Sequence, residues 1–210
     1  MQPNNYLTFY KANVISFFAA LVITGFSIMV GKNNLFLLLN TDLGSNGDTF
    51  FKYATYIGDG VVWAIFAVYI LIFDRKKLPI TLAAIIVSTL IAHYIKGHLI
   101  TVNPRPTSAL PQLKNIIHTI AGVELSYGGS FPSGHTTQAF TMYFLCCILF
   151  KKKWIVWVGF FLALLVGYSR VYQAQHFPID VAGGIFVGIA SAWMALWVQL
   201  WCERKWKVFG

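Results

Sequence analysis

Residues 154–201 read WIVWVGFFLALLVGYSRVYQAQHFPIDVAGGIFVGIASAWMALWVQLW. Two apolar runs flank a short polar connector, and each is close to the roughly 20 residues that an α-helix needs to cross a bilayer. The runs are continuous rather than alternating, which favours helices over the strands of a membrane barrel. This stretch therefore predicts two membrane-spanning helices joined by a connector that contains Arg170, His176 and Asp180.

The same pattern recurs upstream and gives six apolar stretches in all. They lie at about residues 13–30, 61–73, 79–99, 136–150, 154–171 and 179–201. No internal repeat or low-complexity linker divides them, so we expect a single domain over residues 1–210. The predicted fold class is all-α, a bundle of six transmembrane helices.

The composition excludes a soluble globular protein. Hydrophobic residues make up 57% of the 210 residues and charged residues only 11%, and the mean hydropathy is +0.64. Soluble domains carry about a quarter charged residues. The net charge of +9 would suggest nucleic acid in a soluble protein. Here we expect the basic residues to orient the chain in a lipid bilayer, with no nucleic-acid partner.

The distribution of basic residues predicts that orientation. With six spans, ten of the sixteen fall on the side of the two termini: Lys11, Arg75, Lys76, Lys77, Lys151, Lys152, Lys153, Arg204, Lys205 and Lys207. Basic residues in short loops and tails favour the cytoplasmic side. We therefore expect both termini in the cytoplasm, and the loops 31–55 and 100–131 on the outer face.

Residues 48–60, DTFFKYATYIGDG, allow two interpretations. Their aromatic residues recur at helical spacing, so they could form an amphipathic helix on the outer membrane face, capped by Asp48. They could equally form the flared start of the second span. Asp59, between two glycines, is interpreted as a turn residue.

Ionisable residues gather in three places, all at predicted outward ends of spans. These are Lys96–His98 with Arg105 following, residues 130–136, and residues 169–180. Because such residues cost about 2.5–3.5 kcal/mol each at membrane depth, a cluster of them indicates function. We therefore expect an active site at the outward ends of helices 3–6.

The chemistry of the clusters favours a phosphate-bearing substrate. Cations predominate and no pair of carboxylates occurs, which argues against a two-metal phosphatase or a glycosidase. Ser133 is a candidate helix cap, and Gly134 lets backbone N–H groups approach an anion at a helix N-terminus. A carboxylate such as Asp180, four residues after His176, can orient an imidazole and make it a better nucleophile.

Three motifs together resemble the signature of the type 2 phosphatidic acid phosphatase family, which includes lipid A phosphatases and undecaprenyl diphosphate phosphatases. They are an upstream Lys with Arg105-Pro106, then Pro132-Ser133-Gly134-His135, then Ser169-Arg170-x5-His176-x3-Asp180. The motifs occupy residues 96–180, and the six-span outline extends the resemblance to nearly the whole chain.

The resemblance implies a role for each matched residue. His176 matches the nucleophile that forms a phosphohistidine, Asp180 the carboxylate that orients it, and His135 the general acid. The phosphoryl-binding groups match Lys96, Arg105, Ser133, Gly134 and Arg170. No metal and no cofactor are implied.

One spacing departs from the family pattern. The usual first motif has six residues between Lys and Arg-Pro, whereas eight separate Lys96 from Arg105. The usual count leads instead to His98, and positions 96 and 98 point to nearly opposite faces of a helix. We prefer Lys96, because a permanent cation suits phosphate and the following loop can absorb two residues. His98 is the alternative.

The sequence thus predicts a metal-independent lipid phosphatase in the inner membrane of a bacterium, with its active site facing the periplasm. The expected partner is a phosphorylated membrane lipid. Lipid A phosphate is favoured and undecaprenyl diphosphate is the alternative, followed by phosphatidylglycerol phosphate, phosphatidic acid or transfer of the phosphoryl group to another lipid. A transporter and a serine protease using Ser133 are weaker readings, and the oligomeric state is not indicated.

Overall fold

The computed structural model describes residues 3–150 and 152–209, and their side chains between residues 7 and 205. These residues contain helices and no strand. The longer helices are α1 (Pro3–Met29), α2 (Lys32–Leu39), α3 (Gly44–Ala54), α4 (Gly60–Phe73), α5 (Leu78–Tyr94), α7 (Gly134–Leu149), α8 (Trp154–Tyr172) and α9 (Pro178–Phe209). Short helical segments are η1 (Thr55–Gly58), η2 (Arg75–Lys77), η3 (Ile95–Leu99), α6 (Pro106–Ala109) and η4 (Pro111–Leu113). The all-α prediction is confirmed.

Helices long and apolar enough to cross a membrane account for most of the bundle. By length and composition, four segments can each span a bilayer: Leu7–Met29, Arg75–Leu99, Trp154–Tyr172 and Pro178–Lys205. Helix α4 could make a fifth span together with the preceding segment Gly44–Gly58, from which it is bent by 45°. The 16 residues of α7 reach only about 24 Å at 1.5 Å per residue, less than the roughly 30 Å of a hydrocarbon core. The count of six spans therefore stays a prediction.

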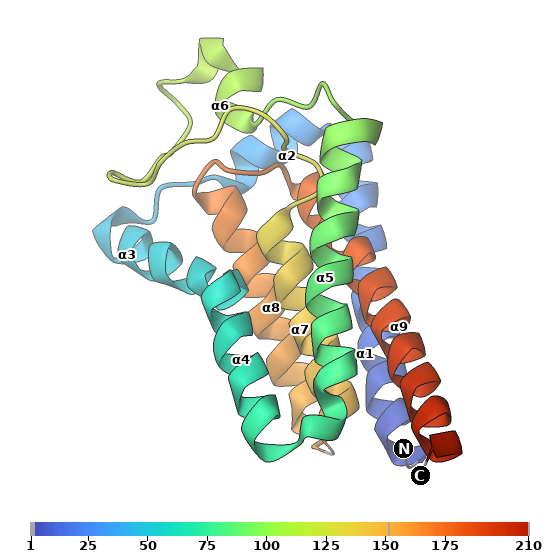
Figure 1. The fold of residues 1–210 in the computed structure, drawn as a ribbon. Helices are drawn as coiled ribbons and strands as arrows, with labels where there is room; N and C mark the ends of the chain where they lie inside the picture. The colour runs from blue at the N-terminus through green and yellow to red at the C-terminus, as the bar shows by residue number, and fades with distance from the viewer. Residues whose placement is uncertain (1–2, 151, 210) are drawn as a thin grey trace.

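Helix α7 lies in the middle of the bundle (Figure 1) and packs against α1, α5, α8 and α9. Most of its side chains are buried, among them Phe140, Phe144 and Ile148. Large apolar side chains on the surrounding helices are exposed instead, such as Phe18, Ile72 and Phe161. Because such exposure suits hydrocarbon and not water, the bundle is that of a multi-pass membrane protein.

Helix α3 turns away from the bundle (Figure 1) and is bent from α4 by 45°, and both interpretations of residues 48–60 stay predictions. It begins at Gly44, and Asp48 does not cap it, which corrects the predicted start. Phe51 packs on Tyr168 and Tyr172, with ring centroids 5.1 and 4.5 Å apart, so α3 is fastened to the end of α8. This contact brings the residues that follow α3 to the polar end of the bundle.

Glycines on α9 let it approach the start of α7. A Cβ on Gly184 would lie 2.8 Å from the carbonyl oxygen of Ser133 and 2.8 Å from Cβ of Thr136. The backbone N–H of Ser133 donates to the carbonyl of Asp180 over 2.9 Å. The two helix starts are therefore held in register by direct backbone contact.

We expect Gly184→Ala to lower the thermal stability of the protein in detergent, because the added methyl group meets a backbone atom. Overpacking of this kind costs about 1–3 kcal/mol. Gly25→Ala in α1 is the matched control, since nothing lies within 4 Å of the position of its Cβ. Equal melting temperatures for the two variants would show that the α7–α9 approach is not close-packed.

Candidate active site

All eight residues assigned to the site by the sequence lie at the end of the bundle opposite to the start of α1 and the end of α9 (Figure 1). They come from η3, the N-cap of α6, the start of α7, the last turn of α8, the α8–α9 connection and the first turn of α9. The connection holds the nucleophile candidate, and the other segments surround it. The site is thus assembled from helix ends that are distant in sequence.

His176 is almost completely buried, with 1% of its surface exposed. Its Nδ1 lies 3.5 Å from Oδ2 of Asp180, and hydrogen bonds of catalytic groups are often long before substrate binds. Ser130 Oγ and the Phe177 N–H both donate to the same carboxylate oxygen and so fix its position. Burial lowers the pKa of His176 to about 4, against the opposing effect of Asp180. The imidazole is therefore neutral at physiological pH, as a nucleophile must be.

Arg170 and Arg105 are held by neutral acceptors. Arg170, which is 8% exposed, donates from Nη1 to Thr55 Oγ1 over 3.0 Å, and its Nε has no partner among the described residues. Arg105 donates from Nη1 to Gln175 Oε1 over 2.7 Å and from Nε to the Gly128 carbonyl over 3.1 Å. Burial lowers the pKa of Arg105, whose guanidinium nonetheless stays charged.

None of the three cations of the site forms an ion pair with a carboxylate in the described part of the chain, whereas Lys77 at the other end of the bundle pairs with Asp74 at 2.6 Å. Burying a positive charge without a negative partner is costly. Lys96, Arg105 and Arg170 thus maintain a positive site that an anion can neutralise.

Lys96 rather than His98 faces this site. The Nζ of Lys96 lies 3.9 Å from the position of a Cβ on Gly134. His98 is exposed and stacks on Tyr94, with ring centroids 5.0 Å apart. Residues 95–99 form a π-turn, closed by the Ile100 N–H on the Ile95 carbonyl at 2.9 Å. This wider turn and the extended chain after it accommodate the two extra residues before Arg105.

Ser133 caps α7, as its position in the sequence predicts. Its Oγ accepts from Thr136 Oγ1 over 2.8 Å and from the Thr136 N–H over 3.4 Å. The first N–H groups of α7, beginning at Gly134, have no partner within the helix. They therefore add the positive end of a helix dipole to the three cations.

Asp59 is a site residue that sequence reasoning missed. Its Oδ1 lies 2.9 Å from Nε2 of His135, so it is more than the turn residue that we expected. Gly58 allows this approach, because a Cβ there would lie 2.8 Å from the His135 carbonyl oxygen. In the sequence, a carboxylate between two glycines just before an apolar stretch could have indicated a functional residue. The sequence alone does not indicate that His135 is its partner. Ser130, Thr55 and Gln175 also join the site, through their hydrogen bonds to Asp180, Arg170 and Arg105.

Two cavities share Asp59 and His135 in their lining. One, of about 250 Å³, is lined on its far side by Lys52, Glu124 and Arg170. The other, of about 220 Å³, opens past His93 and Lys96. A larger apolar cavity of about 420 Å³ lies apart from them between α4, α7 and α8, and suits hydrocarbon rather than the polar chemistry. His135, Lys96 and Arg170 line the first two cavities and are therefore within reach of a polar headgroup, whereas His176 lines neither cavity.

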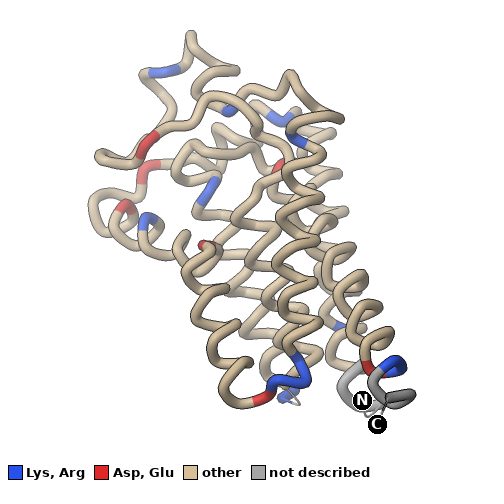
Figure 2. The backbone as a smooth tube through the Cα atoms, in the orientation of Figure 1, with Lys and Arg blue, Asp and Glu red and all other residues tan. Residues whose placement is uncertain are grey.

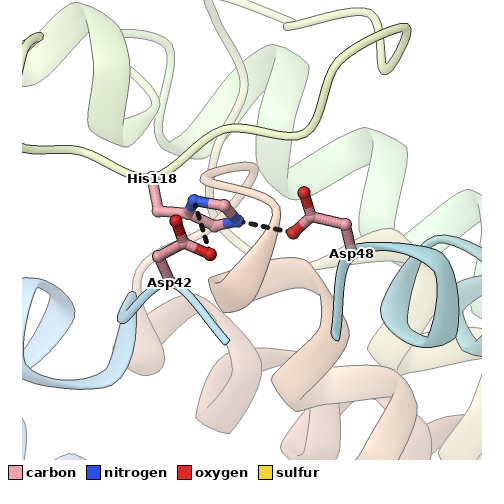
Figure 3. A group of neighbouring side chains, drawn as sticks. All are labelled: Asp42, Asp48 and His118. Atoms are coloured by element: carbon pink, nitrogen blue, oxygen red, sulfur yellow. Dashed lines mark hydrogen bonds and ion pairs between the residues drawn. The ribbon is translucent and has the colours of Figure 1, made fainter. Parts of the chain in front are cut away.

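One group of described residues has the composition of a metal site: Asp42, Asp48 and His118. Figure 3 shows the two carboxylates on different sides of the imidazole: Asp42 Oδ1 is 3.8 Å from Nδ1 and Asp48 Oδ1 is 2.8 Å from Nε2. Tyr172 also donates to Asp48 over 2.8 Å. The group is explained by contacts that join α3, the loop of His118 and α8. His118 is therefore held by both carboxylates and is not free in solvent.

The fold is that of a multi-pass membrane protein with a positively charged, histidine-containing site at one end of its helix bundle. The PAP2 superfamily model matches residues 77–204. The chain belongs to the PAP2 superfamily.

Relatives agree with this assignment. The lipid A 4'-phosphatase of Porphyromonas gingivalis is 27% identical over 85% of this chain and 77% of its own length. The undecaprenyl-diphosphatase of Sulfolobus acidocaldarius is 27% identical over 81% of this chain and 80% of its own length. The bacitracin transport permease protein BcrC of Bacillus licheniformis is 36% identical, over 45% of this chain and only 43% of that protein.

The crystal structure of Aquifex aeolicus LpxE is similar, with a TM-score of 0.64 and 30% identity, over 77% of this chain and 92% of that one. The family predicted from the motifs is thereby confirmed. So is the enzyme class, a lipid phosphate phosphatase, because relatives across most of the chain are named as such.

Proposed function

We propose that this chain is a metal-independent phosphatase that removes a phosphate group from a membrane lipid through a phosphohistidine on His176. The observation that carries the proposal is the set of three unpaired cations around a neutral, buried imidazole. A phosphoryl group supplies the negative charge that this site lacks, and charge stabilisation dominates phosphoryl transfer.

In the first step, Nε2 of His176 attacks phosphorus and the bond from phosphorus to the leaving oxygen breaks. Asp180 holds the ring and stabilises the positive charge that develops on it. His135 donates a proton to the leaving oxygen. In the second step, water attacks the phosphohistidine, His135 takes a proton from that water, and phosphate leaves. Lys96, Arg105, Arg170 and the backbone at Ser133 and Gly134 hold the non-bridging oxygens in both steps.

Lipid A phosphate is our first choice of substrate and undecaprenyl diphosphate the alternative. The names of the relatives that match over most of the chain support both. Phosphatidylglycerol phosphate, and transfer to a second lipid instead of water, are less favoured because the two relatives above are named for the other substrates.

We infer that the site faces the periplasm from the inner membrane of a bacterium, with both termini in the cytoplasm. Supporting this, the basic turn η2 lies at the end of the bundle where α1 begins and α9 ends (Figure 2). Lys152 and Lys153 precede α8 at the same end. Of the residues in the orientation count, Lys151 and the side chain of Lys207 lie outside the described residues.

The test is phosphate release by the purified protein in detergent from lipid A, undecaprenyl diphosphate, phosphatidylglycerol phosphate and phosphatidic acid, all in EDTA. We expect the highest kcat/KM with lipid A and undiminished activity in the chelator. Chelation removes divalent ions from solution, so a loss of activity restored by an added metal would contradict the mechanism. Adding an acceptor lipid separates hydrolysis from transfer by the product formed.

A further inference from the structure

Asp59 forms the closest charged contact of His135. The two side chains are 34% and 30% exposed, and the contact of 2.9 Å is made through Nε2. Both residues line both of the cavities described above, so a substrate can reach the imidazole. The pair resembles His176 with Asp180 in composition, but it joins two separate segments of the chain.

The segment of Asp59 is anchored to the site. Gly58 touches the backbone of His135, as its blocked Cβ position indicates. Thr55, in the same turn, accepts a hydrogen bond from Arg170. The Asp59 carbonyl accepts from the Val62 N–H over 3.1 Å at the start of α4. Asp59 is thus fixed on both sides rather than carried by a free loop.

We propose that Asp59 is a positioning residue that keeps a proton on Nε2 of His135 and thereby assigns proton transfer with the substrate to Nδ1. The proposal rests on the phosphatase function above. Burial and the three cations of the site lower the pKa of His135. A bound phosphoryl group offsets those cations, and a cationic imidazole in such surroundings also needs a carboxylate against it, which Asp59 supplies.

Protons balance over the two steps. With the phosphate ester bound, His135 is an imidazolium with one proton facing Asp59 and the other on Nδ1. The Nδ1 proton passes to the leaving oxygen as its bond to phosphorus breaks, and a neutral ring remains with Nε2–H still on Asp59. The free lone pair of Nδ1 then accepts a proton from the water that hydrolyses the phosphohistidine, which restores the imidazolium.

The experiment compares two monoesters that differ in their need for a proton: an alkyl phosphate lipid, whose alkoxide is a poor leaving group, and p-nitrophenyl phosphate, whose phenolate leaves unprotonated. We expect Asp59→Asn to lower kcat on the alkyl ester by about 10–100-fold, part of the 10²–10⁴-fold that general acids contribute. On the aryl ester the loss should stay within about threefold. Asp59→Glu, which keeps the charge, should recover part of the alkyl-ester rate.

Asp48→Asn is the matched control, because Asp48 also pairs with a histidine, His118, on the same end of the bundle. It should leave the ratio of the two rates unchanged. In a double-mutant cycle, adding Asp59→Asn to His135→Ala should cause no further loss of kcat on the alkyl ester.

Equal losses on both esters for Asp59→Asn would reduce Asp59 to a structural residue and overturn the proposal. The proposal would also be overturned if Asp59→Asn lowered kcat on the alkyl ester as much in the His135→Ala background as in the wild type. If the wild-type protein releases phosphate from neither ester, the phosphatase function itself fails, and the role of Asp59 with it.

Discussion

His176→Ala should lose phosphatase activity by about 10⁴-fold or more, the largest effect of any single change in this chain. Loss of a nucleophile leaves only the binding of the phosphoryl group to assist attack by water. His176→Asn should be equally inactive, and it replaces the imidazole with a polar group of smaller size in the same buried position. Phosphate release from lipid in EDTA is the measurement, with a melting temperature for each variant to show that it folds.

A second readout tests the covalent step directly. Wild-type protein is mixed with a lipid substrate that carries a radiolabelled phosphate, and the reaction is quenched during turnover. We expect the protein to keep the label after a quench with base and to lose it after a quench with acid, because phosphohistidine is labile in acid. Asp180→Asn should still become labelled, but more slowly than the wild type, since the nucleophile remains but its orientation is lost. Activity of His176→Ala within tenfold of wild type would contradict a phosphohistidine mechanism.

The helices were predictable because each apolar run is continuous and bounded. Helices α4, α7 and α8 begin and end within two residues of the predicted stretches. Helix α1 begins at Pro3 instead of 13, and α9 ends at Phe209 instead of 201. Hydropathy marks only the part of a helix that suits hydrocarbon, and a helix can continue into polar sequence at the membrane surface.

The site was predictable where one short segment carries the chemistry. His176 and Asp180 are four residues apart, and Ser133 caps the helix that begins at Gly134, so spacing alone indicates both arrangements. The partners of Asp59 and His118 were not predictable in this way. Each pairs across segments distant in sequence, through the packing of η1 on α7 and of α3 on α8, which no local pattern encodes.

Lys96→Ala should lower kcat/KM for the lipid substrate by about 10²–10³-fold, the range seen when one group that stabilises transition-state charge is removed. Lys96 lies beside Gly134 at the start of α7 and forms no ion pair with any described residue, so its charge is available to the phosphoryl oxygens. His98→Ala is the matched control. That side chain is two residues away, exposed and stacked on Tyr94, and its loss should change the rate by no more than about threefold.

Lys96→Arg separates charge from geometry. Arg keeps the positive charge, but its planar fork is larger than the ammonium beside Gly134, so we expect only partial recovery. For both Lys96 variants the loss should fall mainly on kcat and less on KM. The cation stabilises the negative charge of the transition state more strongly than that of the bound ester. If His98→Ala proves more damaging than Lys96→Ala, the π-turn of residues 95–99 must rearrange when substrate binds. His98, which is separated from Arg105 by the usual six residues, would then be the residue that binds the phosphoryl group.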